Sequence, residues 1–103
     1  MDDLAGRAKV LAQIAALRDD IDTVDIELVR LLSRRAANAL EIGRLKALLQ
    51  MEIYQPAREE AVLRHVRSVN SGPLDGDAMA RLFERIIDEA RRLERAMAER
   101  GHK

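Results

Sequence analysis

Residues 9–50 read KVLAQIAALRDDIDTVDIELVRLLSRRAANALEIGRLKALLQ, an uninterrupted run that contains no proline and a single glycine, Gly43. Apolar residues recur in this run at steps of three and four, which is the heptad spacing of a helix that packs against other helices. We call these positions the apolar seam, and they are Val10, Ile14, Leu17, Ile21, Val24, Leu28, Leu31, Ile42, Leu45 and Leu49. The spacing predicts one helix of about 40 residues and does not fit a strand, whose apolar residues would alternate.

A helix of that size is too long for one small chain to cover. It would extend for about 60 Å, because each residue adds about 1.5 Å. The whole chain has 103 residues, and a globular protein of that size has a radius of gyration of only about 13 Å. We infer that a second copy of the chain covers the rest of the helix, so that the protein forms a homodimer.

Turn residues divide the remainder of the chain into two further helices. Pro56 disfavours helical geometry at Gln55 and itself suits a first helical turn, so a second helix is expected to begin there. The sequence NSGP at residues 70–73 is a dense turn signal that ends this helix. The sequence DGD at residues 75–77 then supplies an N-cap for a third helix, which is expected to end near Gly101. The predicted fold class is all-α, with three helices per chain, the first of them very long.

Composition excludes several classes of protein. Lys and Arg together number 18, as do Asp and Glu, and this net charge of zero disfavours binding to nucleic acid. The chain has no cysteine, so it has no disulfide and no thiolate metal site. It lacks an apolar stretch long enough to span a membrane, and its N-terminus does not resemble a signal peptide. We expect one cytoplasmic domain over residues 1–103, with a core at about residues 10–98 and flexible ends.

Four charged residues interrupt the apolar stripes of these helices. Arg35 stands in the seam four residues after Leu31, where a leucine would be expected. Lys46 follows 11 residues later and points in nearly the same direction, about 16 Å further along the helix. Glu59 shares the apolar face of the second helix, and Glu94 is the only charged member of the main stripe of the third helix.

Charges on apolar faces need partners, because an unpaired buried charge costs several kcal/mol. Structural ion pairs inside a helical bundle are the commoner explanation for any one of these residues. Two basic and two acidic residues together favour a polar pocket between helices. The pattern thus predicts a helical dimer with an internal polar site, without naming its ligand.

The same residues belong to segments that resemble a known family. LRDDID at residues 17–22, LLSRR at 31–35 and IGRLK at 42–46 are similar to the first helix of the all-α class of chorismate mutases. IYQPARE at residues 53–59 is similar to the short loop and the start of the second helix in that family, and LFERII at 82–87 to its third helix. The resemblance covers nearly the whole chain, and the spacing between the segments makes it specific.

The resemblance implies an enzyme that rearranges chorismate to prephenate by a pericyclic shift, at the entry to phenylalanine and tyrosine synthesis. Members of this class are intertwined homodimers of three-helix chains, with two active sites and no metal or cofactor. The reaction needs no nucleophile, but it needs a folded substrate conformer and donor groups where charge develops. The implied catalytic residues are Lys46, Glu94 and Arg35.

Two arginines would hold the two carboxylates of chorismate. The resemblance assigns one carboxylate to Arg35 and the other to Arg18 of the partner subunit. The sequence spacing agrees, because Arg18 and Arg35 lie about 25 Å apart on one helix, beyond the reach of one chorismate molecule. A planar guanidinium suits this task, since it binds a carboxylate through two hydrogen bonds. On the sequence alone, a solvated surface arginine remains an equal alternative for Arg18.

The remaining substrate contacts are implied by the resemblance. Lys46 would donate a hydrogen bond to the ether oxygen of chorismate. Glu59, with the backbone near Gln55 and Arg58, would bind the ring hydroxyl, and Arg58 would brace this corner. Glu94 would lie beside the ether oxygen, to which a glutamate can donate only when it is protonated. Burial would raise the pKa of Glu94, while nearby Lys46 would lower it.

Two of the positions depart from the family pattern. Gln55 stands where many members have aspartate, and the effect is expected to be mild because that contact runs through the backbone. Ala90 stands where some members have a hydroxyl that aids a carboxylate, and that contact is therefore missing here.

Two other functions stay open on the sequence. A related branch of this fold eliminates pyruvate from isochorismate in a similar pocket, so an isochorismate pyruvate lyase would carry similar charges. A non-catalytic helical dimer, acting as a scaffold or a regulatory partner, would also fit the apolar seam. In either enzymatic case, the chain could act alone or with a partner enzyme of the same pathway.

Overall fold

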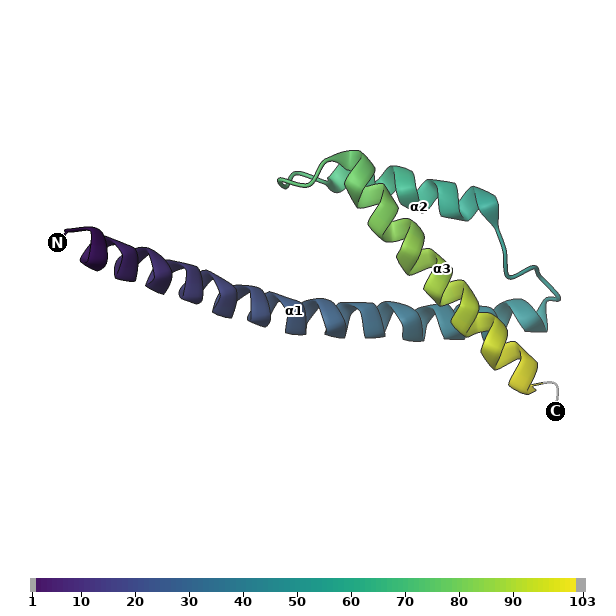
Figure 1. Ribbon diagram of the computed structural model, residues 1–103. Coiled ribbons are helices and arrows are strands. Elements are labelled where there is room, and N and C mark those ends of the chain that lie inside the picture. The colour runs from purple at the N-terminus through teal and green to yellow at the C-terminus, as the bar shows by residue number, and fades with distance from the viewer. Residues whose placement is uncertain (1, 102–103) are drawn as a thin grey trace. The chain divides into compact units, whose positions relative to one another are not determined.

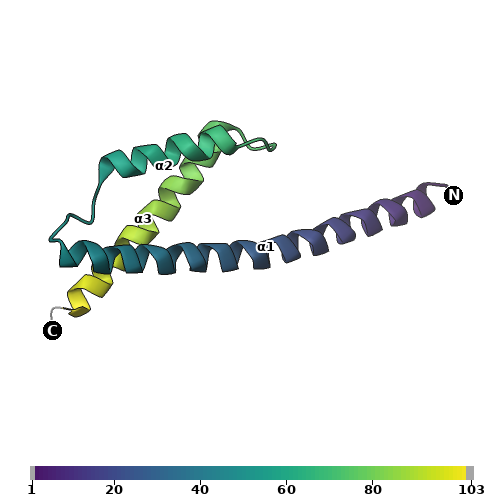
Figure 2. The same ribbon diagram turned by 180° about the vertical axis from the view of Figure 1, so that it is seen from behind.

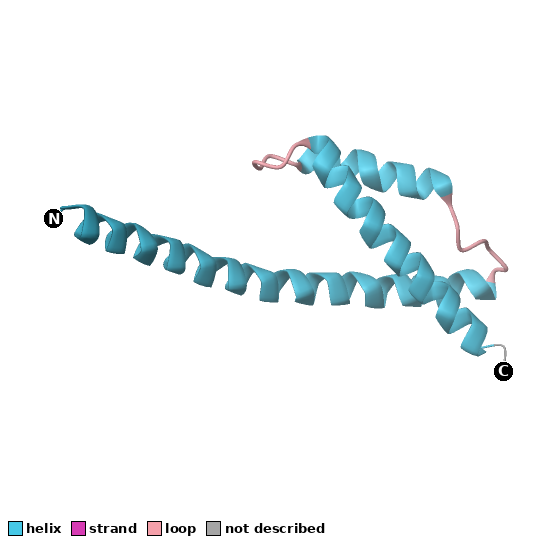
Figure 3. Cartoon of the chain, in the orientation of Figure 1, coloured by secondary structure: helices cyan, strands magenta, loops and turns pink. Residues whose placement is uncertain are grey.

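The computed structural model describes residues 2–101, and the regular secondary structure of that part is entirely helical. Helix α1 spans Asp2–Leu48, α2 spans Pro56–Val69 and α3 spans Gly76–Gly101 (Figure 1, Figure 3). The predicted all-α fold with one very long helix is thereby confirmed. No helix in this part of the chain is long and apolar enough to cross a membrane.

Helix α1 begins at Asp2, whereas the apolar seam predicted a start near Lys9. The added residues include Ala5 and Ala8, and alanine has the highest helix propensity of all residues. Gly6 lies between them and costs only about 1 kcal/mol relative to alanine, which is too little to end a long helix. Local propensity therefore carries the helix beyond the residues that a packing pattern reveals.

The C-terminus of α1 is closed by a Schellman motif. Gln50 has a φ angle of 56°, which lies in the left-handed region. Its N–H donates to the carbonyl of Ala47 at 3.2 Å, and the N–H of Met51 donates to the carbonyl of Lys46 at 2.9 Å. These two bonds satisfy carbonyls that the last turn of a helix otherwise leaves unpaired. The helix consequently ends at Leu48. The sequence had predicted an end at Gln50, two residues later.

Replacing Gln50 with glycine is expected to stabilise the fold. Glycine adopts the left-handed conformation without the steric cost that a Cβ atom brings, which is about 1 kcal/mol or more. The larger entropy of glycine in the unfolded chain offsets part of this gain, so the free energy of unfolding should rise by about 0.5–1 kcal/mol. Chemical denaturation of Gln50→Gly beside the wild type measures the change. Gln50→Ala keeps the Cβ atom and is the matched control; equal stability of the two variants would contradict this explanation.

The chain divides into two compact units, the first ending at Arg34 and the second beginning at Arg35. The described residues of the first unit form the N-terminal part of α1. Large apolar residues of this unit are exposed, and along its part of the seam the exposed fraction runs from 38% at Ile14 to 64% at Leu17. A continuous apolar seam of this length is unusual on a surface that stays in water. The prediction of a single domain stays a prediction.

The second unit contains the end of α1 together with α2 and α3. Helices α2 and α3 form a hairpin, shown from behind in Figure 2, and pack against each other. Two small apolar residues of this hairpin, Val66 and Ala80, are buried. Asp75 caps α3 as predicted, since its carboxylate accepts a hydrogen bond from the N–H of Ala78 at 2.7 Å. The hairpin positions the start of α2 and the second half of α3 around a common space.

Candidate active site

One cavity of about 160 Å³ lies within the second unit, between the end of α1, the loop at residues 49–55, the start of α2 and the middle of α3. Apolar side chains such as Ile42, Val62 and Ile87 form part of its wall. Six polar residues that the sequence analysis selected also line it, namely Arg35, Lys46, Gln55, Arg58, Glu59 and Glu94. Residues far apart in the sequence therefore meet in one pocket, while their individual roles stay predictions.

Arg18 is the one selected residue outside this pocket. It is an exposed residue of α1 in the first unit, where it lies four residues after Ile14 and three before Ile21. These steps put Arg18 at the border of the apolar seam. Its assignment to the site of a partner subunit stays a prediction. Of the two histidines, His65 is exposed and His102 lies outside the described residues.

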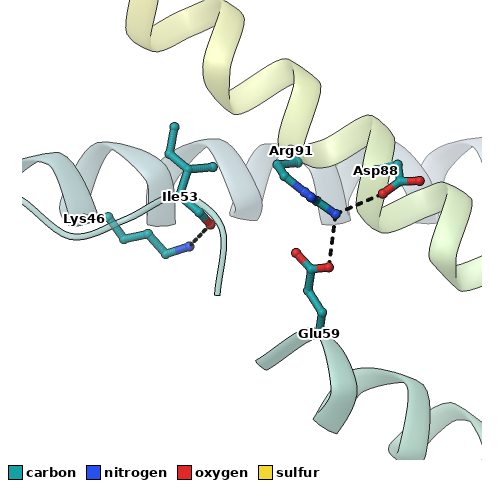
Figure 4. A network of polar contacts seen from close by, with 5 residues as sticks. All are labelled: Lys46, Ile53, Glu59, Asp88 and Arg91. Carbon is teal, nitrogen blue, oxygen red and sulfur yellow. Dashed lines mark hydrogen bonds and ion pairs between the residues drawn. The ribbon is translucent and has the colours of Figure 1, made fainter. Parts of the chain in front are cut away.

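Lys46, in the last turn of α1, lines the pocket, and its side chain extends toward the backbone of Ile53 (Figure 4). Its Nζ donates a hydrogen bond to the backbone carbonyl of Ile53 at 3.3 Å, which ties the helix end to the loop that follows it. A lysine ammonium has three N–H donors, so this contact leaves two for a ligand. Lys46 is half-buried, and in such surroundings a hydrogen bond to an anion is stronger than it is in water.

Glu94 packs closely against α1 at Gly43, where that helix has no Cβ atom. A Cβ atom built at Gly43 would lie 3.3 Å from both Cγ and Oε2 of Glu94, so glycine allows the close approach. Oε2 of Glu94 is buried and has no hydrogen-bond partner among residues 2–101. A buried oxygen without a partner is costly for an ionised carboxylate. The burial of this oxygen therefore disfavours the ionised form of Glu94.

The pKa of Glu94 lies above the usual range of a glutamate because of this burial. The positive charges of Lys46 and Arg91 offset part of the rise, and the negative charge of Glu59 adds to it. These charges come from all three helices, α1, α2 and α3. The net direction is upward, which favours the protonated form, and a protonated carboxyl can donate a hydrogen bond.

Arg91 is a pocket residue that the sequence analysis missed. Its Nη2 contacts Oε1 of Glu59 at 3.0 Å and Oδ1 of Asp88 at 2.9 Å (Figure 4). Its guanidinium carbon lies 4.8 Å from the centre of the Tyr54 ring, within range of a cation–π interaction. The sequence could have identified Arg91 as a pocket residue, because it lies four residues after Ile87 and therefore shares the apolar face of that helix.

The pocket carries more positive than negative charge. Arginine or lysine contributes at four positions, Arg35, Lys46, Arg58 and Arg91, whereas Glu59 and Glu94 are the acidic residues of the lining. Arginine forks suit carboxylates, which they bind through paired hydrogen bonds. The pocket can thus hold a small organic anion with a carboxylate and a further hydrogen-bonding group. Among the described residues, no group of His, Cys, Asp and Glu side chains could hold a metal ion.

Comparison with known proteins gives a consistent set of relatives. The sequence model of the family described as chorismate mutase type II matches residues 17–95. A bifunctional chorismate mutase/prephenate dehydratase of Neisseria gonorrhoeae is 44% identical over 80 residues, which cover 78% of this chain and 22% of that protein. A protein of the same name from Pseudomonas aeruginosa is 39% identical over 90 residues, covering 82% of this chain and 25% of that protein. The chain spans a quarter or less of the length of these two relatives.

Solved structures of similar length share the fold. Form II of chorismate mutase from Thermus thermophilus is 38% identical, with a TM-score of 0.79, and covers 81% of this chain and 94% of that chain. Chorismate mutase from Helicobacter pylori in complex with prephenate is 26% identical, also with a TM-score of 0.79, and covers 85% of this chain and 96% of that chain.

Proposed function

Because the chain belongs to the chorismate mutase type II family, we propose that it rearranges chorismate to prephenate in the pocket of its second unit. The observation that carries this proposal is the gathering of Arg35, Lys46, Glu59 and Glu94 around one small cavity. The prediction from the sequence selected the same residues for binding one substrate. The reaction fits the pocket because it requires placement of an anion rather than a nucleophile or a metal.

Arg35 and Lys46 are proposed to act on different parts of the substrate. The guanidinium of Arg35 binds one carboxylate through two hydrogen bonds and thereby holds chorismate in its compact conformer. Lys46 donates to the ether oxygen, which gains negative charge as its bond to carbon breaks. Because the ammonium is in place before the bond breaks, it stabilises the transition state more than the ground state.

Glu94 is proposed to supply a second donor to the ether oxygen. Glu94 lines the cavity, and its protonated carboxyl would donate a hydrogen bond to the substrate from there. The proton is shared in a hydrogen bond and is not transferred, so that the residue returns unchanged at the end of each cycle. The raised pKa of Glu94 keeps this protonated form available at higher pH than for an ordinary glutamate.

The start of α2 is proposed to bind the ring hydroxyl. The carbonyl of Gln55 accepts hydrogen bonds from the N–H groups of Arg58 and Glu59 at 3.1 and 3.2 Å, which fixes both residues in the first turn. Glu59 accepts the hydroxyl proton in a hydrogen bond, and Arg58 braces this corner of the pocket. Gln55 contributes through its backbone.

A homodimer is proposed to complete the site. The exposed seam of the first unit offers apolar surface that a second copy would cover. Arg18 at the border of this seam would then reach the partner's pocket and bind the second carboxylate. The two relatives described above join chorismate mutase with prephenate dehydratase in one chain, so an enzyme that consumes prephenate is the proposed pathway partner.

Purified protein is expected to consume chorismate and to form prephenate. Loss of chorismate absorbance measures the rate, and acid conversion of prephenate to phenylpyruvate identifies the product. Arg35→Ala provides the background, since this variant should lose most of the enzymatic rate. A parallel assay with isochorismate tests for the lyase, and formation of salicylate without turnover of chorismate would overturn the proposal. Turnover of neither substrate would favour a non-catalytic helical dimer.

A further inference from the structure

We propose that Arg91 is a positioning residue that holds the carboxylate of Glu59 in place for the ring hydroxyl of the substrate. This inference rests on the proposed function, because it assigns Arg91 a role in the same reaction. The proposed role of Arg91 is exerted through Glu59, to which it donates a hydrogen bond. The resemblance of the sequence to the family gave Arg91 no role.

The contact between these two residues joins two helices at the pocket. Arg91 lies on α3 and Glu59 in the first turn of α2, and Nη2 of Arg91 donates to Oε1 of Glu59 at 3.0 Å (Figure 4). Both side chains are largely shielded from water, with 22% and 25% of their surfaces exposed. An ion pair in such surroundings is screened less by salt and water than a surface pair is. The ion pair with Arg91 can therefore fix the direction in which the carboxylate of Glu59 points.

Arg91 is itself held in position from two further sides. Asp88, one turn earlier on α3, accepts from the same Nη2 at 2.9 Å. The ring of Tyr54, in the loop before α2, lies against the guanidinium at 4.8 Å. A long arginine side chain loses rotamer entropy when it is fixed in one conformation. Because these contacts already order the side chain in the free protein, this entropy is not lost again when the substrate binds. The residue is in this sense preorganised.

The use of one carboxylate oxygen leaves the other free for the substrate. Oε1 of Glu59 is engaged by Arg91, so Oε2 is the oxygen that would accept the hydroxyl hydrogen bond. Without Arg91, the carboxylate of Glu59 could rotate about its side-chain torsions and would lose its alignment. The loss would weaken binding of the substrate and of the transition state alike, because the hydroxyl keeps its own bonds throughout the rearrangement. We therefore expect the change mainly in KM rather than in kcat.

A second consequence follows from the charges around Glu94. Lys46 from α1, Glu59 from α2 and Arg91 from α3 all act on the pKa of Glu94, and Arg35 and Arg58 also line the cavity. Arg91 lowers this pKa, so its removal should raise the pKa further. The decline of activity at high pH would then move to higher pH in an Arg91 variant. This shift reports the charge of Arg91 beside Glu94, whereas the positioning of Glu59 is tested by the double-mutant cycle.

The test is a double-mutant cycle between Arg91→Met and Glu59→Gln in the full chain. In the wild-type background, Arg91→Met should raise KM by about tenfold, as expected for loss of a charged hydrogen bond, with little change in kcat. In the Glu59→Gln background, the same substitution should change KM by less than about twofold, because no carboxylate remains to be positioned. The matched control is Arg92→Met, which removes a neighbouring arginine whose side chain is 72% exposed and pairs with Glu89.

Several outcomes would overturn the inference. An equal effect of Arg91→Met in both backgrounds would show that Arg91 acts independently of Glu59, and unchanged KM would show that it does not position anything. If thermal melting shows that Arg91→Met is unfolded, Arg91→Gln takes its place in the cycle, and an equal effect on KM in both backgrounds overturns the role. Inactive wild-type protein would instead refute the proposed function and, with it, this inference.

Discussion

Mixing two inactive variants, Arg18→Ala and Arg35→Ala, is expected to restore about a quarter of the wild-type activity. Each variant alone should lose at least about a hundredfold in kcat/KM, because each leaves one substrate carboxylate without its arginine partner. After the two chains are unfolded and refolded together, half of the dimers should be mixed. Chorismate consumption by the refolded mixture, compared with each variant refolded alone, measures the recovery.

The recovery follows from the way in which the proposed site is shared. In a mixed dimer, one pocket combines Arg35 of the first chain with Arg18 of the second, and both of these residues are intact. The other pocket lacks both. Each mixed dimer thus has one working site out of two, and half of all dimers are mixed, which gives about a quarter of the activity.

The control for this experiment is Arg30→Ala, which removes an arginine from the same helix. The side chain of Arg30 is 74% exposed and pairs only loosely with Glu27, at 3.6 Å. This variant should keep wild-type activity, and a mixture of Arg30→Ala with Arg35→Ala should show no recovery beyond simple dilution. Absence of recovery from Arg18→Ala and Arg35→Ala, in a sample that light scattering shows to be dimeric, would mean that Arg18 and Arg35 do not share a site across the dimer.

The sequence was informative about the fold where local rules apply. Helix periodicity predicted the long α1, and Pro56 and Asp75 marked the starts of α2 and α3 because proline geometry and capping act over one or two residues. The left-handed conformation of Gln50 gave no such signal, since glycine is the residue that normally marks it. The early start of α1 was missed because its first residues contribute propensity rather than a packing pattern.

The pocket was predictable to the extent that its residues interrupt an apolar stripe. Arg35 and Glu94 each stand where an apolar residue is expected, and each lines the cavity. Arg91 was missed because the stripe of α3 is broad and Glu94 was taken as its only charge. The contact from Arg91 to Glu59 joins α2 to α3 across 32 positions of sequence, and only the packing of the hairpin reveals it.

Activity of the wild type is expected to fall as the pH rises, and Glu94→Gln should remove this fall. Only protonated Glu94 can donate to the ether oxygen, so above its pKa the active fraction decreases by about tenfold per pH unit. Burial places this pKa above the usual range of a glutamate, and the fall should begin at correspondingly higher pH. Measurement of kcat for both proteins across a series of buffers of constant ionic strength compares the profiles.

A bound substrate should raise the pKa of Glu94 further. Chorismate carries two negative charges, which disfavour an ionised Glu94 nearby and raise its pKa again, so kcat should fall at higher pH than kcat/KM does. Glutamine donates from its amide at every pH, which is why its profile should be flat over the same range. Glu89→Gln is the matched control, because Glu89 lies on the same helix but pairs with Arg85 and Arg92 at the surface. If Glu94→Gln is inactive at every pH while Glu89→Gln is not, the carboxyl of Glu94 acts in its ionised form and the proposed hydrogen bond to the ether oxygen is wrong.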